Sequence, residues 1–265
     1  MIKKEKKLSD FTILKVDGIT KRFGGVSALD GVSFSVSHGQ IVSLIGPNGA
    51  GKTTLFNCIT ALATPEEGSI YFGDSGTVLN RLDPYEITAK GIARTFQTIR
   101  LFKHMTVLEN VMVGAHTKTR GGFAAALFRP RWVLVEEKKI RAQAKRLLAF
   151  FGIHAKADEL AKNLSYGHQR KLEIARALAS EPKLLLLDEP AAGMNPKEKD
   201  ELLELIRVIC RRGVTVLLIE HDMKVVMPIS DKIAVLDYGK KIAEGTPRDI
   251  QTNLRVIEAY LGKHA

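Results

Sequence analysis

Apolar residues along this chain fall into short runs, with polar and charged stretches of helical spacing between them. The runs at residues 41–45, 184–187, 214–219 and 233–236 have the length of buried strands, and a charged amphipathic stretch at 197–211 separates two of them. Strands that alternate with helices at this spacing pair in parallel and are covered by the helices. The pattern therefore predicts an α/β core.

Two parts of the chain depart from this alternation. Residues 11–16, 32–36 and 69–72 predict three further strands around the first core strand. From about residue 98 to residue 180 the apolar positions recur with helical spacing, which predicts a helical subdomain inserted into the core. Within it, residues 117–130 are rich in Gly and Ala and fit either a loop or a loosely held helix.

We expect a single domain over residues 11–265, preceded by a basic tail at residues 1–10. A short C-terminal segment is expected at about residues 240–265. The 265 residues, 45% hydrophobic and 26% charged, have ordinary globular composition. We find neither an apolar run of the roughly 20 residues that cross a bilayer nor a secretory signal, and we expect a soluble, cytoplasmic protein.

The net charge of +11 is compatible with nucleic acid, with anionic lipid, or with a nucleotide-phosphate site on a scattered basic surface. Charge alone does not choose among these partners. The two cysteines, Cys58 and Cys210, lie far apart in the chain and suggest neither a metal site nor a disulfide framework.

Residues 46–53, with the sequence GPNGAGKT, fit the phosphate-loop pattern GxxxxGK[ST] between an apolar strand and a helix expected at 52–62. Glycines let the backbone curl so that its N–H groups point at phosphate oxygens, and the helix start adds its positive end. Lys52 supplies a charge for the β- and γ-phosphates, Thr53 a hydroxyl for Mg²⁺. The predicted nucleotide site includes Gly46, Asn48, Gly49, Gly51, Lys52, Thr53 and Thr54.

A second candidate site follows the apolar run 184–187, where Asp188 and Glu189 stand side by side. Asp188 can hold Mg²⁺ directly or through water, because hard cations take oxygen ligands. Glu189 can orient and deprotonate the attacking water. Lys52, Asp188 and His221 each lie just beyond a predicted parallel strand, so we expect them to converge, with His221 at the γ-phosphate.

The segment LSYGHQR at residues 164–170, here named the signature segment, opens a helix shortly before the acidic pair. Ser165 and the backbone amides of this helix start predict a second anion site. With this segment the chain resembles the ATP-binding-cassette (ABC) ATPases over nearly its whole length. The resemblance implies a P-loop NTPase (RecA-like) core with an ABC-type antiparallel β part and an inserted helical subdomain.

In the ABC family each signature segment caps the γ-phosphate held by the opposite subunit. The resemblance therefore implies that Ser165 and Gly167 contact a partner's ATP in a head-to-tail dimer. It also implies that Phe23 stacks on adenine and that Gln97 senses Mg²⁺ and the attacking water. Residues 98–114 would form part of a groove for a helix of a membrane partner, with contacts from Phe102 and Met105.

Three residues depart from the usual family pattern: Tyr166 and His168 in the signature segment, and Asn195 where Asp is usual. Together with neighbouring segments they resemble the ATPases of bacterial branched-chain amino acid importers. The segments that carry this resemblance are 94–97 (RTFQ), 164–170, 188–196 (DEPAAGMNP), 219–223 (IEHDM) and 257–262 (IEAYLG).

The resemblance implies the motor of an importer, in which ATP-driven dimer closure is coupled to a separate membrane permease. The partners would be permease subunits, a second ABC ATPase (identical or different) and, indirectly, an extracytoplasmic solute-binding protein. The chain would lie on the inner face of the cell membrane.

The net charge also permits a nucleic-acid-linked ABC ATPase of repair or translation. Such relatives typically carry a coiled-coil insertion or tandem cassettes, and this chain has neither, so we expect no nucleic acid. A GTPase switch is disfavoured because no NKxD-type base-reading motif is present.

Overall fold

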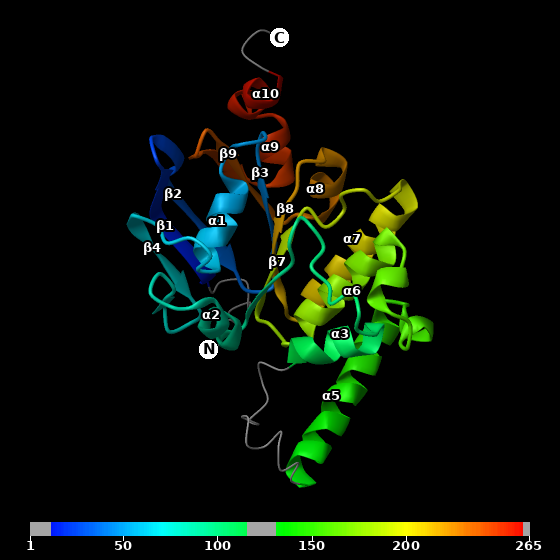
Figure 1. The fold of residues 1–265 in the computed structure, drawn as a ribbon. Helices are drawn as coiled ribbons and strands as arrows, with labels where there is room; N and C mark the ends of the chain where they lie inside the picture. Colours follow the sequence, from blue (N-terminus) through cyan, green and yellow to red (C-terminus); the bar gives the residue numbers. More distant parts are fainter. Residues whose placement is uncertain (1–11, 116–130, 262–265) are drawn as a thin grey trace, which may run out of the picture.

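The computed structural model describes residues 12–115 and 131–261, arranged as two sheets on one side and a layer of helices on the other (Figure 1). The larger sheet has six strands in the order β10-β9-β3-β8-β7-β6. Their bounds are β3 Ile41–Ile45, β6 Ile92–Arg94, β7 Leu184–Asp188, β8 Thr215–Ile219, β9 Lys232–Asp237 and β10 Lys240–Gly245. The four predicted core strands are confirmed.

Parallel pairing joins β6, β7, β8, β3 and β9, and among the described strands of this sheet only β10 runs antiparallel to its neighbour. Every residue of β3, β7 and β8 is buried, which explains their continuous apolar runs. The strand β10 was missed because its sequence, KKIAEG, lies at the sheet edge with no buried residue and therefore no apolar run.

The smaller sheet is antiparallel, in the order β2-β1-β4-β5, and confirms the expected antiparallel part. Its strands are β1 Thr12–Phe23, β2 Val26–Ser37, β4 Glu67–Phe72 and β5 Thr77–Val78. The predictions of strands at 11–16 and 32–36 were too short, because β1 and β2 form one long hairpin. Register shifts along β1, between Val16 and Ile19 among others, break the apolar alternation that would have revealed its length.

Helices cover both faces of the parallel sheet. On the side of the antiparallel sheet lie α1 (Lys52–Ile59) and α2 (Pro84–Lys90). The predicted helix 52–62 ends at Ile59, and Ala61 follows with a left-handed φ of 56°. At the chain's end, α8 (Met223–Ile229), α9 (Pro247–Gln251) and α10 (Leu254–Leu261) follow β8 and β10.

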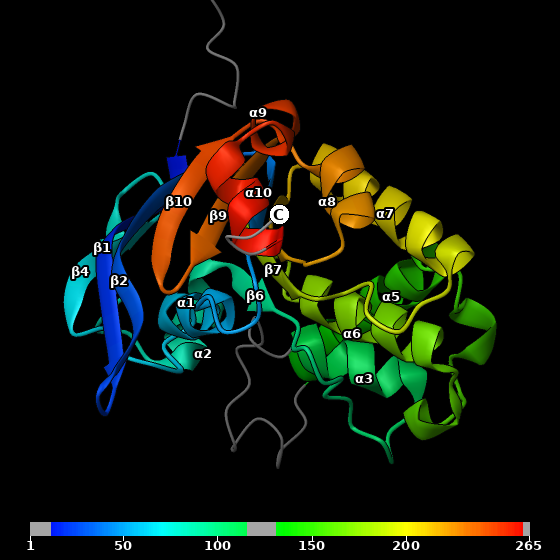
Figure 2. The same ribbon diagram turned by 90° about the horizontal axis from the view of Figure 1, so that it is seen from above.

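The helical layer lies on the opposite side (Figure 2). It contains α3 (Val107–Gly114), α5 (Arg131–Phe150), α6 (Tyr166–Leu178) and α7 (Pro196–Arg211), with two short 3₁₀ turns, η3 (His154–Lys156) and η4 (Ala161–Asn163). Helices thus occupy much of the stretch whose spacing predicted them, while the Gly- and Ala-rich stretch at 117–130 lies outside the described residues. None of the described helices has the length and apolar character needed to cross a bilayer.

Alternate residues of β7 and β8 point into different cores, because successive side chains of a strand face opposite sides. Leu185, Leu187 and Leu218 pack against the helical layer. Leu184, Leu186 and other residues pack against α1 and the antiparallel sheet. The parallel sheet therefore packs against a hydrophobic core on each face. The position of the carboxyl ends of its strands depends on both cores.

We predict that Leu186→Ala lowers the free energy of unfolding by about 2–5 kcal/mol, because it removes a fully buried side chain and leaves a cavity. Leu186 has 0% exposed surface, whereas Leu254 is 74% exposed and provides a matched control. Leu254→Ala should stay within about 0.5 kcal/mol of the parent protein. Urea unfolding followed by circular dichroism measures both, and equal midpoints would contradict the central place of β7.

Candidate functional site

The loop at residues 46–51 joins β3 to α1 and is packed against backbone on two sides. A Cβ atom on Gly46 would lie 2.0 Å from the carbonyl oxygen of Leu236, and one on Gly51 would lie 2.4 Å from that of Ala28. Only glycine fits at either position. Among the described residues no side chain caps the start of α1, so its first N–H groups can bind an anion.

Lys52 begins α1, and its side chain folds back over the loop. Its Nζ donates hydrogen bonds to the carbonyl oxygens of Gly46 (2.6 Å) and Pro47 (2.9 Å). Burial lowers the pKa of Lys52, while the nearby charges of Glu189 and Asp188 oppose that shift. The ammonium group therefore lies in the loop within electrostatic reach of both carboxylates. Asn48, Gly49 and Thr53 are exposed at the loop surface, and Thr54 is half-buried.

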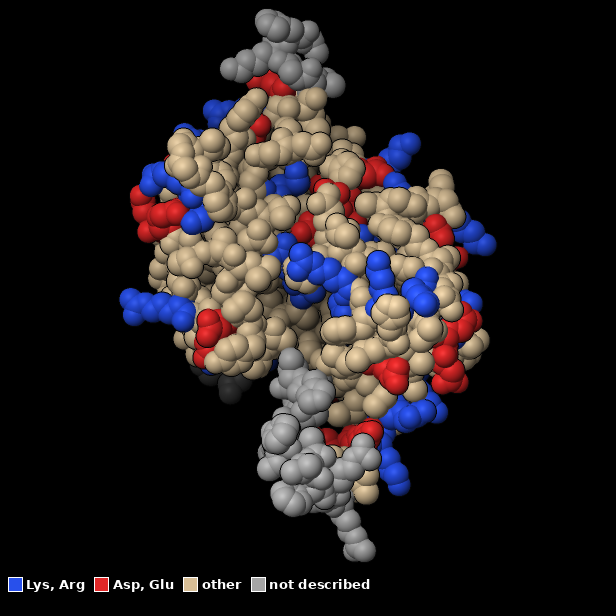
Figure 3. Space-filling view, viewed as in Figure 1, with Lys and Arg blue, Asp and Glu red and all other residues tan. Residues whose placement is uncertain are grey.

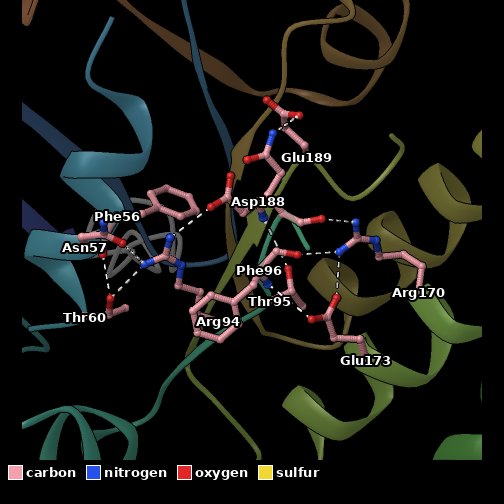
Figure 4. Close-up of polar contacts among 11 residues, drawn as sticks. Phe56, Asn57, Thr60, Arg94, Thr95, Phe96, Arg170, Glu173, Asp188 and Glu189 are labelled. Carbon is pink, nitrogen blue, oxygen red and sulfur yellow. Dashed lines mark hydrogen bonds and ion pairs between the residues drawn. The ribbon is translucent and has the colours of Figure 1, made fainter. Parts of the chain in front are cut away.

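Asp188 is the last residue of β7 and is 1% exposed. Its Oδ2 accepts a hydrogen bond from Nη2 of Arg94 (3.0 Å), as Figure 4 shows. Its Oδ1 is buried and has no hydrogen-bond partner among the described residues. Burial raises the pKa of Asp188, and the hydrogen bond from Arg94 opposes this. An unpartnered buried carboxylate oxygen is a fitting ligand for a hard cation or its water.

Arg94, at the end of β6, was not predicted as a site residue. Besides Asp188 it binds Oδ1 of Asn57 (2.7 Å) and Oγ1 of Thr60 (3.1 Å), both from the α1 region. Its guanidinium carbon lies 5.4 Å from the ring centre of Phe56 and 5.1 Å from that of Phe96. Arg94 therefore ties α1 to β7 and orients Asp188. The signal available in the sequence was a cation in a strand-length apolar stretch.

Glu189 lies between Gln97 and His221. Its Oε2 accepts a hydrogen bond from Nε2 of Gln97 (3.0 Å), and its Oε1 lies 3.5 Å from Nδ1 of His221. The backbone φ of Glu189 is +45°, a costly value for a residue with a side chain. Such strain occurs at functional sites, where surrounding structure holds the residue in place. The predicted convergence of the phosphate loop, the acidic pair and His221 is confirmed as geometry.

Glu220, also missed from the sequence, fixes the turn beside this group. It is 1% exposed, and its carboxylate accepts hydrogen bonds from the backbone N–H groups of Ala191 (3.1 Å) and His221 (3.2 Å). Burial raises the pKa of Glu220. By binding both chain segments, Glu220 holds the loop after β7 against the end of β8.

The signature segment lies apart from the phosphate loop in the structure. Ser165 caps α6 by accepting a hydrogen bond from the N–H of His168, and a Cβ on Gly167 would lie 2.7 Å from Oε1 of Glu198. In Figures 1 and 2, α6 lies in the helical layer, across the parallel sheet from α1. Ser165 and Gly167 therefore do not join Lys52, Asp188 and Glu189 within one chain.

Phe23 ends β1 and is 53% exposed. The contact of Gly51 with Ala28 on β2 brings this hairpin beside the phosphate loop. The Nζ of Lys21 lies 5.1 Å from the ring centre of Phe23. An exposed aromatic ring next to the loop fits the predicted base contact, which stays a prediction.

Asn195, noted as a departure from the family pattern, caps α7. Its Oδ1 accepts a hydrogen bond from the N–H of Glu198 (3.0 Å), and Oε2 of Glu198 accepts one from the N–H of Asn195 (3.1 Å). Asn and Asp cap helices about equally well. The missing charge therefore leaves the start of α7 intact.

We predict that Gly46→Ala destabilises the protein more than Gly49→Ala does. The new methyl group at Gly46 meets backbone at 2.0 Å, whereas a Cβ at Gly49 meets nothing within 4 Å and carries only the strain of a φ of 82°. That strain costs about 1–2 kcal/mol. Thermal unfolding without nucleotide compares the two variants, and a Gly46→Ala midpoint equal to or above that of Gly49→Ala would contradict the packing of the loop against β9.

Comparison with known proteins finds family models and relatives that match this chain. The family model described as "ABC transporter" matches residues 29–192, and the one described as "Branched-chain amino acid ATP-binding cassette transporter" matches residues 240–265. The high-affinity branched-chain amino acid transport ATP-binding protein BraF of Pseudomonas aeruginosa is 47% identical over 252 residues, 95% of this chain and 98% of the relative. LivG of Escherichia coli, with the same description, is 45% identical over 252 residues, with the same shares.

Solved structures of ABC cassettes share the fold. A nucleotide-free cassette from an ABC transporter has a TM-score of 0.82 at 35% identity, covering 96% of this chain and 100% of that one. The ADP conformation of the cassette MJ1267 has a TM-score of 0.82 at 36% identity, with the same coverage. The cassette MJ0796, dimeric and bound to ADP and Pi, has a TM-score of 0.75 at 29% identity, covering 89% and 99%. The chain thus has the expected P-loop ABC fold, and it belongs to the ATP-binding-cassette transporter family as one of its nucleotide-binding ATPases.

Proposed function

We propose that Glu189 is the general base that activates water for ATP hydrolysis in this chain. The observation that carries the proposal is the position of its carboxylate, 3.0 Å from Nε2 of Gln97 and 3.5 Å from Nδ1 of His221, one residue after Asp188. A carboxylate held by two neighbours can take a proton from water without reorganising. Gln97 orients that water, and His221 contacts the γ-phosphate.

The phosphate loop binds the nucleotide in this proposal. Lys52 exchanges the carbonyl oxygens of Gly46 and Pro47 for the β- and γ-phosphates, which are better partners for an ammonium group. The backbone of Gly46, Asn48, Gly49 and Gly51, with Thr54, surrounds the phosphates, while Phe23 stacks on adenine. Thr53, Asp188 and Gln97 would hold Mg²⁺, which neutralises phosphate charge when bound.

A dimer completes the site. Ser165 and Gly167 lie in the helical layer, away from the phosphate loop of their own chain, and the start of α6 is a suitable anion site. In a head-to-tail dimer they would bind the ATP held by the partner. The dimeric ADP- and Pi-bound structure of the related cassette MJ0796 supports a dimer for the present chain.

A groove of about 660 Å³ between the core and the helical layer is the proposed docking site for a helix of a separate membrane permease. Figure 3 shows Lys and Arg side chains gathered where the core meets the helical layer. Phe102 lines the groove, as expected, whereas Met105 is not among the described lining residues. The helical subdomain at about residues 98–180 would carry the permease's motion to Gln97.

We further propose that the chain powers import of branched-chain amino acids on the inner face of the cell membrane, together with permease subunits, a second ABC ATPase and an extracytoplasmic solute-binding protein. The descriptions of BraF and LivG and the match at residues 240–265 support this. No observation favours the nucleic-acid-linked alternative beyond the net charge of +11.

We predict that Glu189→Gln slows ATP hydrolysis by about 10²–10⁴-fold, because loss of a general base costs that much, while ATP binding persists. The variant should accumulate as an ATP-bound dimer in size-exclusion chromatography. Lys52→Ala is the control without nucleotide binding. Ser165→Arg combined with Glu189→Gln should bind ATP as a monomer. Normal turnover by Glu189→Gln would assign the base elsewhere, and an ATP-dependent dimer of the double variant would refute the shared site.

The transport proposal is tested by purifying the tagged chain from detergent-solubilised membranes of its native cell. We expect permease subunits and a second ABC ATPase to accompany it. In proteoliposomes, ATPase activity of this complex should rise with the solute-binding protein loaded with leucine, isoleucine or valine, and not with the same protein given arginine. Co-purification of ribosomes or DNA in place of membrane proteins would contradict the import proposal.

A further inference from the structure

The helix α6 carries a buried ion pair that contacts the segment containing Gln97. Arg170 is 0% exposed, and its Nη1 lies 2.7 Å from Oε2 of Glu173, which is 1% exposed. The same guanidinium donates from Nη1 to the carbonyl oxygen of Phe96 (2.7 Å) and from Nη2 to that of Gln97 (2.9 Å). Figure 4 shows this fork reaching from α6 to the segment.

Glu173 binds the same segment through its other oxygen. Its Oε1 accepts hydrogen bonds from the backbone N–H groups of Phe96 (3.4 Å) and Arg100 (3.2 Å). The pair therefore satisfies backbone donors and acceptors on both sides of Gln97, in a stretch between β6 and α3 that has no regular secondary structure. The backbone of Gln97 is held from α6, which leaves its side chain to bind Glu189.

Stability alone does not account for this ion pair. Desolvating two charges cancels most of their attraction, and apolar residues of similar volume often replace such pairs without loss of stability. Apolar residues could not make the directed hydrogen bonds that this pair makes to two backbone carbonyl oxygens and two backbone N–H groups. The geometry of these hydrogen bonds determines where the amide of Gln97 lies.

A further contact reaches the surface of the signature segment. The Nη2 of Arg170 lies 3.3 Å from the hydroxyl oxygen of Tyr166, a side chain that is 45% exposed and next to Ser165. A continuous series of contacts thus runs from Tyr166 through Arg170 to the backbone of Gln97, and from the Gln97 side chain to Glu189.

We propose that Arg170 is a positioning residue that places Gln97 against Glu189 and links that placement to the signature segment of the same subunit. The inference rests on the proposed roles of Gln97 and Glu189 and goes beyond them. Binding of the partner's ATP at Ser165 and Gly167, which flank Tyr166, then fixes Arg170 and through it the water-orienting amide of Gln97.

A double-mutant cycle tests the proposal in the full-length chain. Arg170→Met should lower kcat about 10²-fold, the cost of a misplaced group, with the KM for ATP changed little. In a Gln97→Ala background the same substitution should change kcat less than about twofold, because residues that act through one another are not additive. Losses that multiply in the double variant would overturn the proposal.

Two further variants separate positioning from folding. Arg170→Met combined with Glu173→Leu removes both buried charges and leaves neither uncompensated, so it should lose less thermal stability than Arg170→Met alone, but it should not recover the parent's kcat. Arg170→Lys keeps the charge but replaces the fork with a single ammonium group, and its kcat should stay below about one tenth of the parent value. Parent-like kcat in either folded variant would overturn the proposal.

Controls separate this inference from the proposed base. Lys171→Met removes an ion pair on the same helix, between Nζ of Lys171 and Oε2 of Glu201 (3.0 Å), and should leave kcat unchanged. If Glu189→Gln hydrolyses ATP at the parent rate, the proposed base is wrong. If Glu189→Gln is inactive while Arg170→Lys has the parent kcat, only the positioning role of Arg170 is wrong.

Discussion

Parallel pairing of β3, β8 and β7 determines where the phosphate loop, the acidic pair and His221 lie. Leu44 pairs with Ile219, and Ile219 pairs with Asp188, so the three strands end level with one another. The phosphate loop, His221 and Glu189 follow directly from those ends. Since each strand is buried along its whole length, a one-residue slip would expose apolar surface and misalign the groups together.

Buried charged side chains then hold the site residues in position at the ends of these strands. Arg94 holds Asp188 by one oxygen and leaves the other without a partner among the described residues, while Arg170 and Glu173 hold the backbone around Gln97. Neither arginine belongs to the apolar cores. Arg170 supplies hydrogen bonds that the segment after β6 cannot make for itself, because buried backbone groups require partners. Arg94 instead bonds the side chains of Asn57, Thr60 and Asp188.

Local patterns made much of this predictable. The phosphate loop, the acidic pair and the four core strands depend on neighbouring residues, such as the glycines at 46–51 and the run at 184–187. Arg94, Arg170 and Glu220 escaped prediction because their roles rest on partners distant in the chain, as in the contact of Arg94 with Asp188. The β1–β2 hairpin escaped because register shifts disrupt its alternation.

Gln97 is bound at both ends by different parts of the molecule. Its carbonyl oxygen is held by Arg170 from the helical layer, and its side chain is held by Glu189 at the end of β7. A hydrogen bond weakens steeply once the heavy atoms separate beyond about 3.2 Å. A shift of about 1 Å between α6 and β7 therefore breaks one of the two contacts, and this makes the environment of Glu189 sensitive to the position of the helical layer.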